Sequence, residues 1–169
     1  MKARVRTIID GDTVTVTTAK KATLTLRIAC IDTPELAQSP YGVDAKDKLT
    51  GLISVGSAVT FTKKAIDRFG RTVAEVFTKH NINVGAELVK TGYAFVYREY
   101  AGQCDADTLI NYENSAAERK LGIWAVSNLE KPWDFRGDSS GDPSTDGGGQ
   151  STAIPPYSGT RLITCTQIT

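Results

Sequence analysis

Two acidic corners interrupt an otherwise strand-rich N-terminal segment. The first is Ile9-Asp10-Gly11-Asp12-Thr13, and the second is Ile31-Asp32-Thr33-Pro34-Glu35. Carboxylates lower the stability of β-structure, and clustered carboxylates repel one another unless a cation lies between them. We therefore interpret the two corners as a divalent-metal site suited to phosphodiester chemistry.

The predicted metal ligands come from both corners. Asp12, Asp32 and the carbonyl oxygen of Thr33 would give a hard cation three oxygen ligands, with water completing the shell. Asp10 is a weaker fourth candidate, because a single Asp at such a position is better explained as a turn residue that bonds its own backbone. The pairing of Asp12 with Asp32, beside Glu35, favours the metal.

Glu35 is the candidate general base that takes a proton from an attacking water. It follows Pro34, so it is not a strand residue, and its alternative role is a solvated loop acid or a charge that leads into a helix. His80 is the only histidine and lies in a distant polar turn. The sequence offers no Ser–His or Cys–His pairing, so a hydrolase built from it would use carboxylate and metal.

Arg27 and Arg71 are the candidate phosphate-binding groups. Each guanidinium is a rigid fork that suits two phosphate oxygens. An arginine in the middle of an alternating strand is costly unless it is paired, so the alternative for Arg27 is a salt bridge to Asp32 or Glu35. The two interpretations are compatible, because such a pair would hold the site together before substrate arrives.

Aromatic and basic residues nearby could contact a polyanion. Phe69 and Tyr100 are the candidates for stacking a base or touching the terminal phosphate. Lys63, Lys64 and Arg68 could steer a nucleic acid, although a solvated charged edge explains them equally simply.

The elements that must position these residues follow from hydrophobic periodicity and turn signals. Period-two alternation predicts strands, helical spacing predicts helices, and Pro and Gly mark their ends. Residues 93–100 are expected to be extended, and residues 123–136 to dock back on the core. Expected strands are two within 5–18, broken at 10–12, then 23–31, 58–64 and 72–77; expected helices are 41–55, 84–91 and 106–121. This set predicts an α+β, mainly β, five-stranded OB-fold barrel with three helices.

Composition sets broad limits. The chain has 169 residues and a net charge of +1. Residues 137–169 carry a net charge of −2, so residues 1–136 carry +3. Charge alone therefore does not reveal a nucleic-acid partner. No apolar run approaches the ~20 residues of a membrane span, so no membrane association is expected.

The three cysteines, Cys30, Cys104 and Cys165, lack metal-ligand spacing. Their odd number argues against a full disulfide framework. A bridge between Cys104 and Cys165 in an oxidising compartment is the less favoured alternative.

The domain boundaries follow from composition. Residues 1–136 are the predicted nuclease domain, and residues 137–152 are a Gly/Ser/Asp-rich linker. Residues 153–169 are too short for a core of their own and are interpreted as a C-terminal arm or the start of a truncated segment.

Several short motifs follow one another between residues 5 and 124. They combine the acidic corners and the arginines with glycine-rich turns and a C-terminal aromatic. They are Ile9-Asp10-Gly11-Asp12-Thr13, Leu26-Arg27-Ile28, Ile31-Asp32-Thr33-Pro34-Glu35, Tyr41-Gly42, Asp67-Arg68-Phe69-Gly70-Arg71, Glu87-Leu88-Val89, Gly92-Tyr93-Ala94, and Glu113 through Gly122-Ile123-Trp124.

In this order and spacing the chain resembles the staphylococcal nuclease (thermonuclease) family. The resemblance implies a calcium-dependent phosphodiesterase that cleaves DNA and RNA and leaves 3′-phosphate and 5′-hydroxyl ends. It implies Ca²⁺ ligands at Asp12, Asp32 and Thr33, Glu35 as the base, and Arg27 and Arg71 on the phosphate. We also expect a monomer that prefers single strands and cuts duplex more slowly, because breathing must expose the backbone.

The sequence departs from the family pattern at several positions. Residues 36–40 form a shorter loop without lysines, and Phe69 replaces a tyrosine whose hydroxyl would reach a phosphate. Arg98 replaces one of two pocket tyrosines, whereas Tyr100 keeps the other. Cys30 replaces a small or aliphatic residue and is expected to be a buried thiol.

Two alternative functions differ in class from a general nuclease. One is a nucleic-acid-binding module without catalysis, which would be free to lose some of the residues Asp12, Arg27, Asp32, Glu35 and Arg71. The other is an accessory nuclease of a plasmid or other mobile element. No signal peptide precedes the first strand, so the expected location is secreted or periplasmic with the leader absent from this sequence, or cytoplasmic for a plasmid-encoded accessory protein.

Overall fold

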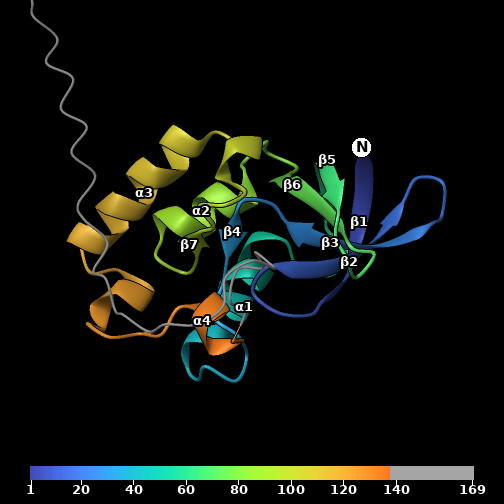
Figure 1. Ribbon diagram of the computed structural model, residues 1–169. Coiled ribbons are helices and arrows are strands. Elements are labelled where there is room, and N and C mark those ends of the chain that lie inside the picture. Colours follow the sequence, from blue (N-terminus) through green and yellow to red (C-terminus); the bar gives the residue numbers. More distant parts are fainter. Residues whose placement is uncertain (138–169) are drawn as a thin grey trace, which may run out of the picture.

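The computed structural model describes residues 1–137, in which five strands close into a barrel and the helices lie to one side of it (Figure 1). The barrel strands are β1 (Lys2–Ile8), β2 (Thr13–Thr18), β3 (Thr23–Ile28), β5 (Ala58–Ile66) and β6 (Thr72–Thr78). Their order is β1-β2-β3-β6-β5, and pairing of β1 with β5 closes the barrel. All neighbours are antiparallel except β3 and β6. The predicted five-stranded OB-type barrel is therefore confirmed.

The barrel core follows from the alternation of the strands. Val14 pairs with Leu26 across β2 and β3, and Phe61 pairs with Val76 across β5 and β6. All four side chains are at most 1% exposed. Because burial of apolar surface is the main favourable term in folding, this interior fixes which side of each strand faces outward.

The three predicted helices are present with slightly earlier ends: α1 (Tyr41–Leu52), α2 (Val84–Lys90) and α3 (Ala106–Glu118). α2 begins where the Asn83 side chain accepts a hydrogen bond from the backbone N–H of Ala86, and Asp105 caps α3 in the same way. Two 3₁₀ turns, η1 (Ala101–Gln103) and η2 (Gly122–Ala125), follow β7 and α3.

The segment after α3 docks on the core as predicted, since Ile123 in η2 is only 3% exposed. It then forms a further short helix, α4 (Pro132–Phe135), that the sequence did not predict. Pro132 stands at its first position, where a missing backbone N–H costs nothing.

The prediction of one continuous strand over residues 23–31 was wrong. β3 ends at Ile28, the chain turns at Ala29 and Cys30, and β4 (Ile31–Asp32) then pairs with β7 (Phe95–Val96). The turn requires a positive φ of 66° at Cys30, which is uncommon for a residue with a Cβ. The expected extended segment at 93–100 is likewise reduced to the two residues of β7.

The cysteine expectations are also corrected. Cys30 is bonded to Cys104 rather than being a free buried thiol, although 74 residues separate the two positions. The turn after β3 and the loop before α3 bring their Cα atoms to 6.4 Å, within the range that a disulfide spans. This pairing rules out the alternative Cys104–Cys165 bridge in this structure.

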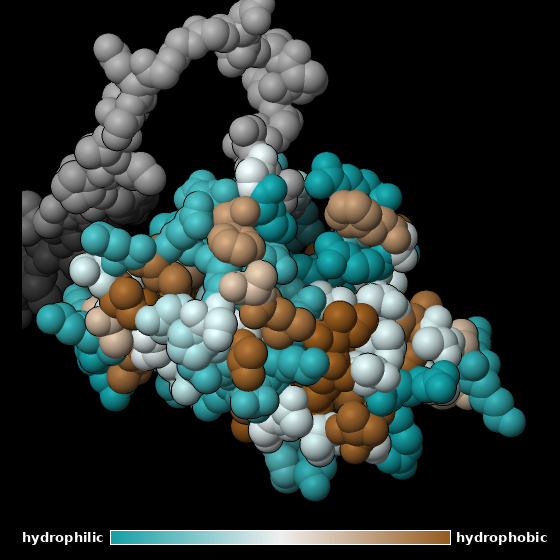
Figure 2. Space-filling view, turned by 90° about the horizontal axis from the view of Figure 1, so that it is seen from below, coloured by the Kyte–Doolittle hydropathy of each residue, from teal (hydrophilic) through white to brown (hydrophobic). Residues whose placement is uncertain are grey.

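Some predictions lie outside the described residues. They concern the linker at 137–152 beyond Gly137, the arm at 153–169, and Cys165. Among the described helices, none combines the length and apolar character needed to cross a membrane. On the face that Figure 2 views from below, brown apolar atoms are interspersed with teal hydrophilic ones.

Candidate active site

The first acidic corner is the turn between β1 and β2. Asp10 Oδ1 accepts a hydrogen bond from the backbone N–H of Asp12 at 3.0 Å, so Asp10 has the turn role favoured from the sequence. Gly11 allows the corner to pack closely, because a Cβ there would lie 2.7 Å from Thr33 Oγ1 and 2.8 Å from the Ala45 Cβ. The glycine of this motif is thus needed for a close approach.

Asp12 joins the two corners through its carboxylate. Its Oδ2 accepts hydrogen bonds from the backbone N–H of Thr33 at 3.0 Å and from Thr33 Oγ1 at 2.9 Å. Its Oδ1 accepts from Thr13 Oγ1 at 3.1 Å. The start of β2 and the exit from β4 therefore meet at one carboxylate, as the two-corner interpretation requires.

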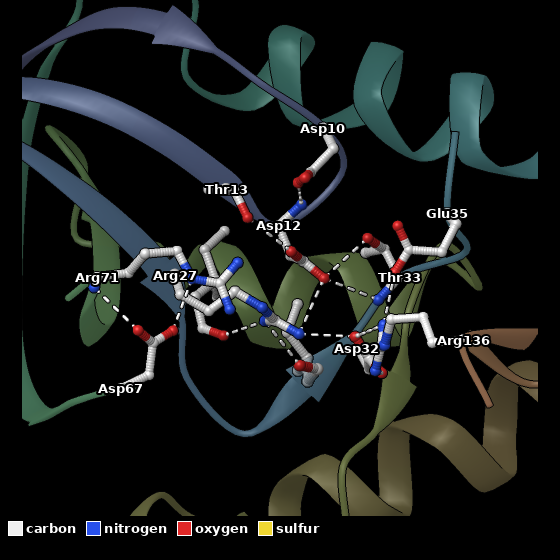
Figure 3. Close-up of polar contacts among 12 residues, drawn as sticks. Asp10, Asp12, Thr13, Arg27, Asp32, Thr33, Glu35, Asp67, Arg71 and Arg136 are labelled. Carbon is white, nitrogen blue, oxygen red and sulfur yellow. Dashed lines mark hydrogen bonds and ion pairs between the residues drawn. The ribbon is translucent and has the colours of Figure 1, made fainter. Parts of the chain in front are cut away.

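Arg27 lies between the two aspartates (Figure 3). Its Nη1 donates to the carbonyl oxygens of Ile28 and Ile31, at 2.7 and 3.0 Å, on either side of the Ala29–Cys30 turn. Its Nη2 lies 2.6 Å from Asp32 Oδ1 and 3.2 Å from Asp12 Oδ2. The predicted salt bridge of Arg27 is therefore made with Asp32, and the guanidinium also stabilises the turn that presents this residue.

Burial, and to a smaller extent neighbouring negative charge, disfavours the ionised form of the carboxylates at the corners. Burial raises the pKa of Asp32, the Arg27 and Arg136 guanidiniums oppose that shift, and the neighbouring Asp12 adds to it. Burial and then the charge of Asp12 raise the pKa of Asp10 from 3.8 to about 6. A further cation near Asp10 and Asp32 would favour their ionised forms and so lower both pKa values.

The donor set fits a hard cation. Asp12 and Asp32 are 5% and 1% exposed and lie on one wall of the same cavity with Thr33. Within residues 1–137 no three His, Cys, Asp and Glu side chains gather as a metal cluster. Two carboxylates and one carbonyl, with water filling the other positions, suit calcium better than a metal that needs nitrogen or sulfur ligands.

Glu35 lies in a loop outside the strands, and hydrogen bonds of its backbone hold it there. Its N–H donates to Gln38 Oε1 at 2.8 Å, and its carbonyl oxygen accepts from the N–H of Gln38. A Cβ on Gly42 would lie 2.0 Å from the same carbonyl, so α1 can pack on this loop only through a glycine. The Glu35 side chain is 35% exposed, which allows a water molecule to reach it.

Arg71 follows the turn between β5 and β6. The backbone N–H of Gly70 closes this turn by donating a hydrogen bond to the carbonyl oxygen of Asp67 at 3.0 Å. Arg71 Nε lies 2.6 Å from Asp67 Oδ2. Burial is the largest single effect on the pKa of Asp67 and raises it, but the hydrogen bonds and charge of Arg71, together with the hydrogen bond from Phe69, hold that pKa below its usual value. Phe69 at the turn is 69% exposed and has the guanidiniums of Arg68 and Arg71 beside its ring.

One cavity of about 960 Å³ brings the predicted site residues together. Tyr100 stands at its edge, 44% exposed, with its ring edge-on to Tyr97. Arg98 instead pairs with Glu113 of α3 and is not among the lining residues. The predicted residues on the cavity wall are Asp12, Arg27, Asp32, Thr33, Glu35, Phe69, Arg71 and Tyr100.

Two site residues were missed from the sequence. Gln38 orients the Glu35 loop, and Arg136 lies 2.6 Å from Glu35 Oε1 and 2.7 Å from Asp32 Oδ2. Neither residue belongs to a motif with chemical meaning in the sequence. The only available signal for Arg136 was a basic residue three positions after Trp133, in the segment expected to dock on the core.

Comparison with known proteins gives consistent results. The family model described as "Staphylococcal nuclease homologue" matches residues 25–126. A protein named micrococcal nuclease from Shigella flexneri is 34% identical over 137 residues, which cover 76% of each chain. An uncharacterized endonuclease from Haemophilus influenzae is 37% identical over 134 residues, covering 79% of this chain and 71% of its own. Protein ParB from Escherichia coli is 30% identical over 148 residues, covering 83% and 81%.

Proposed function

Because the chain belongs to the staphylococcal nuclease homologue family, we propose that it is a calcium-dependent phosphodiesterase that hydrolyses DNA and RNA. The observation that carries this proposal is the convergence of two buried carboxylates, a partly exposed carboxylate and two arginines on one cavity. Each of these residue types has a role in metal-assisted hydrolysis of a phosphodiester, whereas a module that only binds nucleic acid would need neither Glu35 nor the buried pair. We assign this activity to residues 1–136.

The roles follow from the contacts. Asp12, Asp32 and the carbonyl of Thr33 would hold Ca²⁺, which when bound supplies positive charge beside a phosphate oxygen. Arg27 and Arg71 would donate hydrogen bonds to the non-bridging oxygens, on which negative charge accumulates during the reaction. Phe69 and Tyr100, both exposed at the edge of the cavity, would contact the base or sugar next to the scissile phosphate.

Glu35 would accept one proton from a water molecule as the water oxygen bonds to phosphorus. The bond from phosphorus to the 5′ oxygen then breaks, and the leaving oxygen takes a proton from solvent. The products are a 3′-phosphate and a 5′-hydroxyl. This polarity is the one expected from the family resemblance.

Single-stranded DNA and RNA are the proposed substrates, with the protein acting as a monomer. Phe69 and Tyr100 are exposed at the edge of the cavity, so a base of a single-stranded nucleic acid could stack there without first being unpaired. A duplex would first have to breathe, so slower cleavage is expected.

The Cys30–Cys104 disulfide supports a location in an oxidising compartment, either secreted or periplasmic. A reducing cytoplasm would work against this bond. The accessory-nuclease alternative, with cytoplasmic action on plasmid DNA, stays a prediction.

One experiment tests the proposal. The protein is incubated with 5′-labelled single-stranded DNA, and in parallel with RNA, in millimolar calcium or in EGTA. We expect cleavage only with calcium, and ends that a 3′-phosphatase shifts on a sequencing gel. Absence of cleavage in calcium would overturn the enzyme proposal and leave the non-catalytic binding module as the better account.

A further inference from the structure

Arg136, at the end of α4, reaches into the predicted metal site from a distant part of the chain (Figure 3). Its Nη2 lies 2.7 Å from Asp32 Oδ2, and its Nη1 donates to Glu35 Oε1 at 2.6 Å. The sequence separations are 104 and 101 residues. The matched family segment ends at residue 126, so Arg136 comes from outside it.

An aromatic cluster holds α4 in place. The Trp133 ring stacks on Tyr97 at 5.6 Å with an angle of 12°, and meets Phe95 edge-on at 5.8 Å. The ammonium group of Lys131 lies 5.0 to 5.9 Å from the ring centres of Phe95, Trp124 and Trp133. Stacking and cation–π contacts of this kind stabilise a short helix that could not form alone.

Gln38 connects this segment to the loop of the predicted base. Its Oε1 accepts from the Glu35 N–H, and its Nε2 donates to the carbonyl oxygen of Glu130, both at 2.8 Å. Gln38 is 7% exposed, so water could not easily replace either hydrogen bond if the Gln38 side chain were removed. The docked position of α4 and the position of Glu35 are therefore linked through one side chain.

The contacts of Asp32 leave little capacity for another cation. Arg27 occupies Oδ1 at 2.6 Å and Arg136 occupies Oδ2 at 2.7 Å. A metal bound directly at Oδ2 would meet the Arg136 guanidinium at short range, where like charges repel strongly in a partly buried site. Glu35 is affected too, because the oxygen that would take a proton from water already accepts a hydrogen bond from Arg136.

We propose that Arg136 is an internal competitor of the metal, and that the site binds calcium only when α4 moves its guanidinium away from Asp32 and Glu35. This inference rests on the proposed calcium site. By linkage, if Arg136 weakens calcium binding, calcium must weaken the docking of α4 to the same extent. Both halves of that relation can be measured.

The first experiment is calorimetric titration of the full chain with CaCl₂, comparing wild type, Arg136→Gln and the matched control Arg119→Gln. Arg119 is exposed after α3 and has no ion pair among those described in residues 1–137. We expect the Kd for calcium to fall about tenfold in Arg136→Gln and to stay unchanged in Arg119→Gln. A second variant, Trp133→Ala, keeps Arg136 but loosens α4 and should shift the Kd in the same direction.

The second experiment follows α4 itself. Trp124 and Trp133 are the only two tryptophans of the chain and both belong to the aromatic cluster. Calcium should change their fluorescence in wild type, and hydrogen exchange should become faster at residues 131–136. In Arg136→Gln the exchange of this segment should be fast already without calcium.

The outcomes distinguish a failure of the competitor role of Arg136 from a failure of the proposed calcium site. Equal or weaker calcium binding by Arg136→Gln, with normal binding by wild type, would overturn the competitor role and leave the proposed function intact. Loss of cleavage by Arg136→Gln at saturating calcium would also overturn it, because Arg136 would then act on the substrate. Absence of calcium binding by every variant would sink the calcium site and this inference with it.

Discussion

The backbone N–H of Glu35 donates a hydrogen bond to the side-chain oxygen of Gln38 at 2.8 Å. This contact fixes the loop that carries the proposed base, and Gln38 is almost fully buried. Gln38→Met should therefore lower the free energy of unfolding by about 1–3 kcal/mol, because it leaves the N–H of Glu35 and the carbonyl of Glu130 without a partner. It should also lower kcat by about tenfold, since the base is less well positioned.

Urea unfolding and steady-state cleavage of single-stranded DNA measure the two effects. Gln103→Met is the matched control, because Gln103 lines the same cavity but is exposed. If Gln38→Met keeps wild-type stability and kcat, the hydrogen bond to Glu35 has no positioning role.

Glu35→Gln tests the base directly. The amide oxygen can still accept from Arg136, so the fold and the α4 contact should persist, but the side chain can no longer take a proton. We expect kcat to fall by about 10²–10⁴-fold, with little change in binding of a non-cleaved oligonucleotide. Glu118→Gln, on the exposed end of α3, serves as the control. A rate near that of wild type would mean that another group activates the water.

Lysine substitutions should separate the two proposed phosphate-binding arginines. Arg27 makes four contacts in a nearly buried position, so Arg27→Lys should cost about 3–5 kcal/mol of stability as well as activity. Within residues 1–137 Arg71 forms an ion pair only with Asp67, and its side chain is 32% exposed, so Arg71→Lys should cost less than about 1 kcal/mol of stability.

Both variants should lose about tenfold or more in kcat/KM, because lysine cannot reproduce a bidentate fork. Thermal unfolding and cleavage assays on the same preparations give the comparison. An Arg71→Lys variant as unstable as Arg27→Lys would show that Arg71 is structural rather than directed at substrate.

Much of the site could be predicted because its residues lie close together in the sequence. Asp12 directly precedes β2, Arg27 lies near the end of β3 opposite Thr13, and Asp32 follows in β4, so alternation and turn signals alone place them at one end of the barrel. The barrel itself follows from five segments of period-two alternation. Local patterns of this kind are the ones that sequence reasoning reads well.

The missed features depend on long-range contacts or unusual backbone geometry. Arg136 reaches Glu35 across 101 residues, and no local pattern encodes such a contact. The turn at Ala29–Cys30 interrupts an apolar run that continues without Gly or Pro, and a positive φ at a cysteine has no sequence signal. The same turn places Cys30 next to Cys104, so missing it also led to the wrong cysteine pairing.

The Cys30–Cys104 bond should contribute strongly to stability. It closes a loop across 74 residues and connects the turn before β4 to the loop before α3. The double variant Cys30→Ala/Cys104→Ala should therefore unfold with about 2–4 kcal/mol less free energy than wild type. Dithiothreitol should lower the stability of wild type by the same amount and leave that of the double variant unchanged. Equal stability of oxidised and fully reduced wild type, confirmed by thiol titration, would contradict this.

Asp10 should make the calcium-free protein less stable as the pH rises from about 4 to 6. Burial and the charge of Asp12 raise its pKa in the folded state from 3.8 to about 6. Between these values the folded protein binds more protons than the unfolded chain, so the free energy of unfolding falls with rising pH, and the full penalty applies above pH 6. Asp10→Asn keeps the oxygen that accepts from the Asp12 N–H and removes the charge.

We expect Asp10→Asn to be more stable than wild type by about 2 kcal/mol at pH 7 in EDTA, and to lose nearly all of this advantage at about pH 3, where Asp10 is largely protonated in both states. Because the two proteins share every other titrating group, the difference between their urea midpoints isolates Asp10. Asp44→Asn, an exposed position in the first turn of α1, provides the control and should not gain stability over this range. A difference that is independent of pH would mean that the Asp10 carboxylate stays ionised in the fold, and that charge repulsion at this corner is already relieved without the metal.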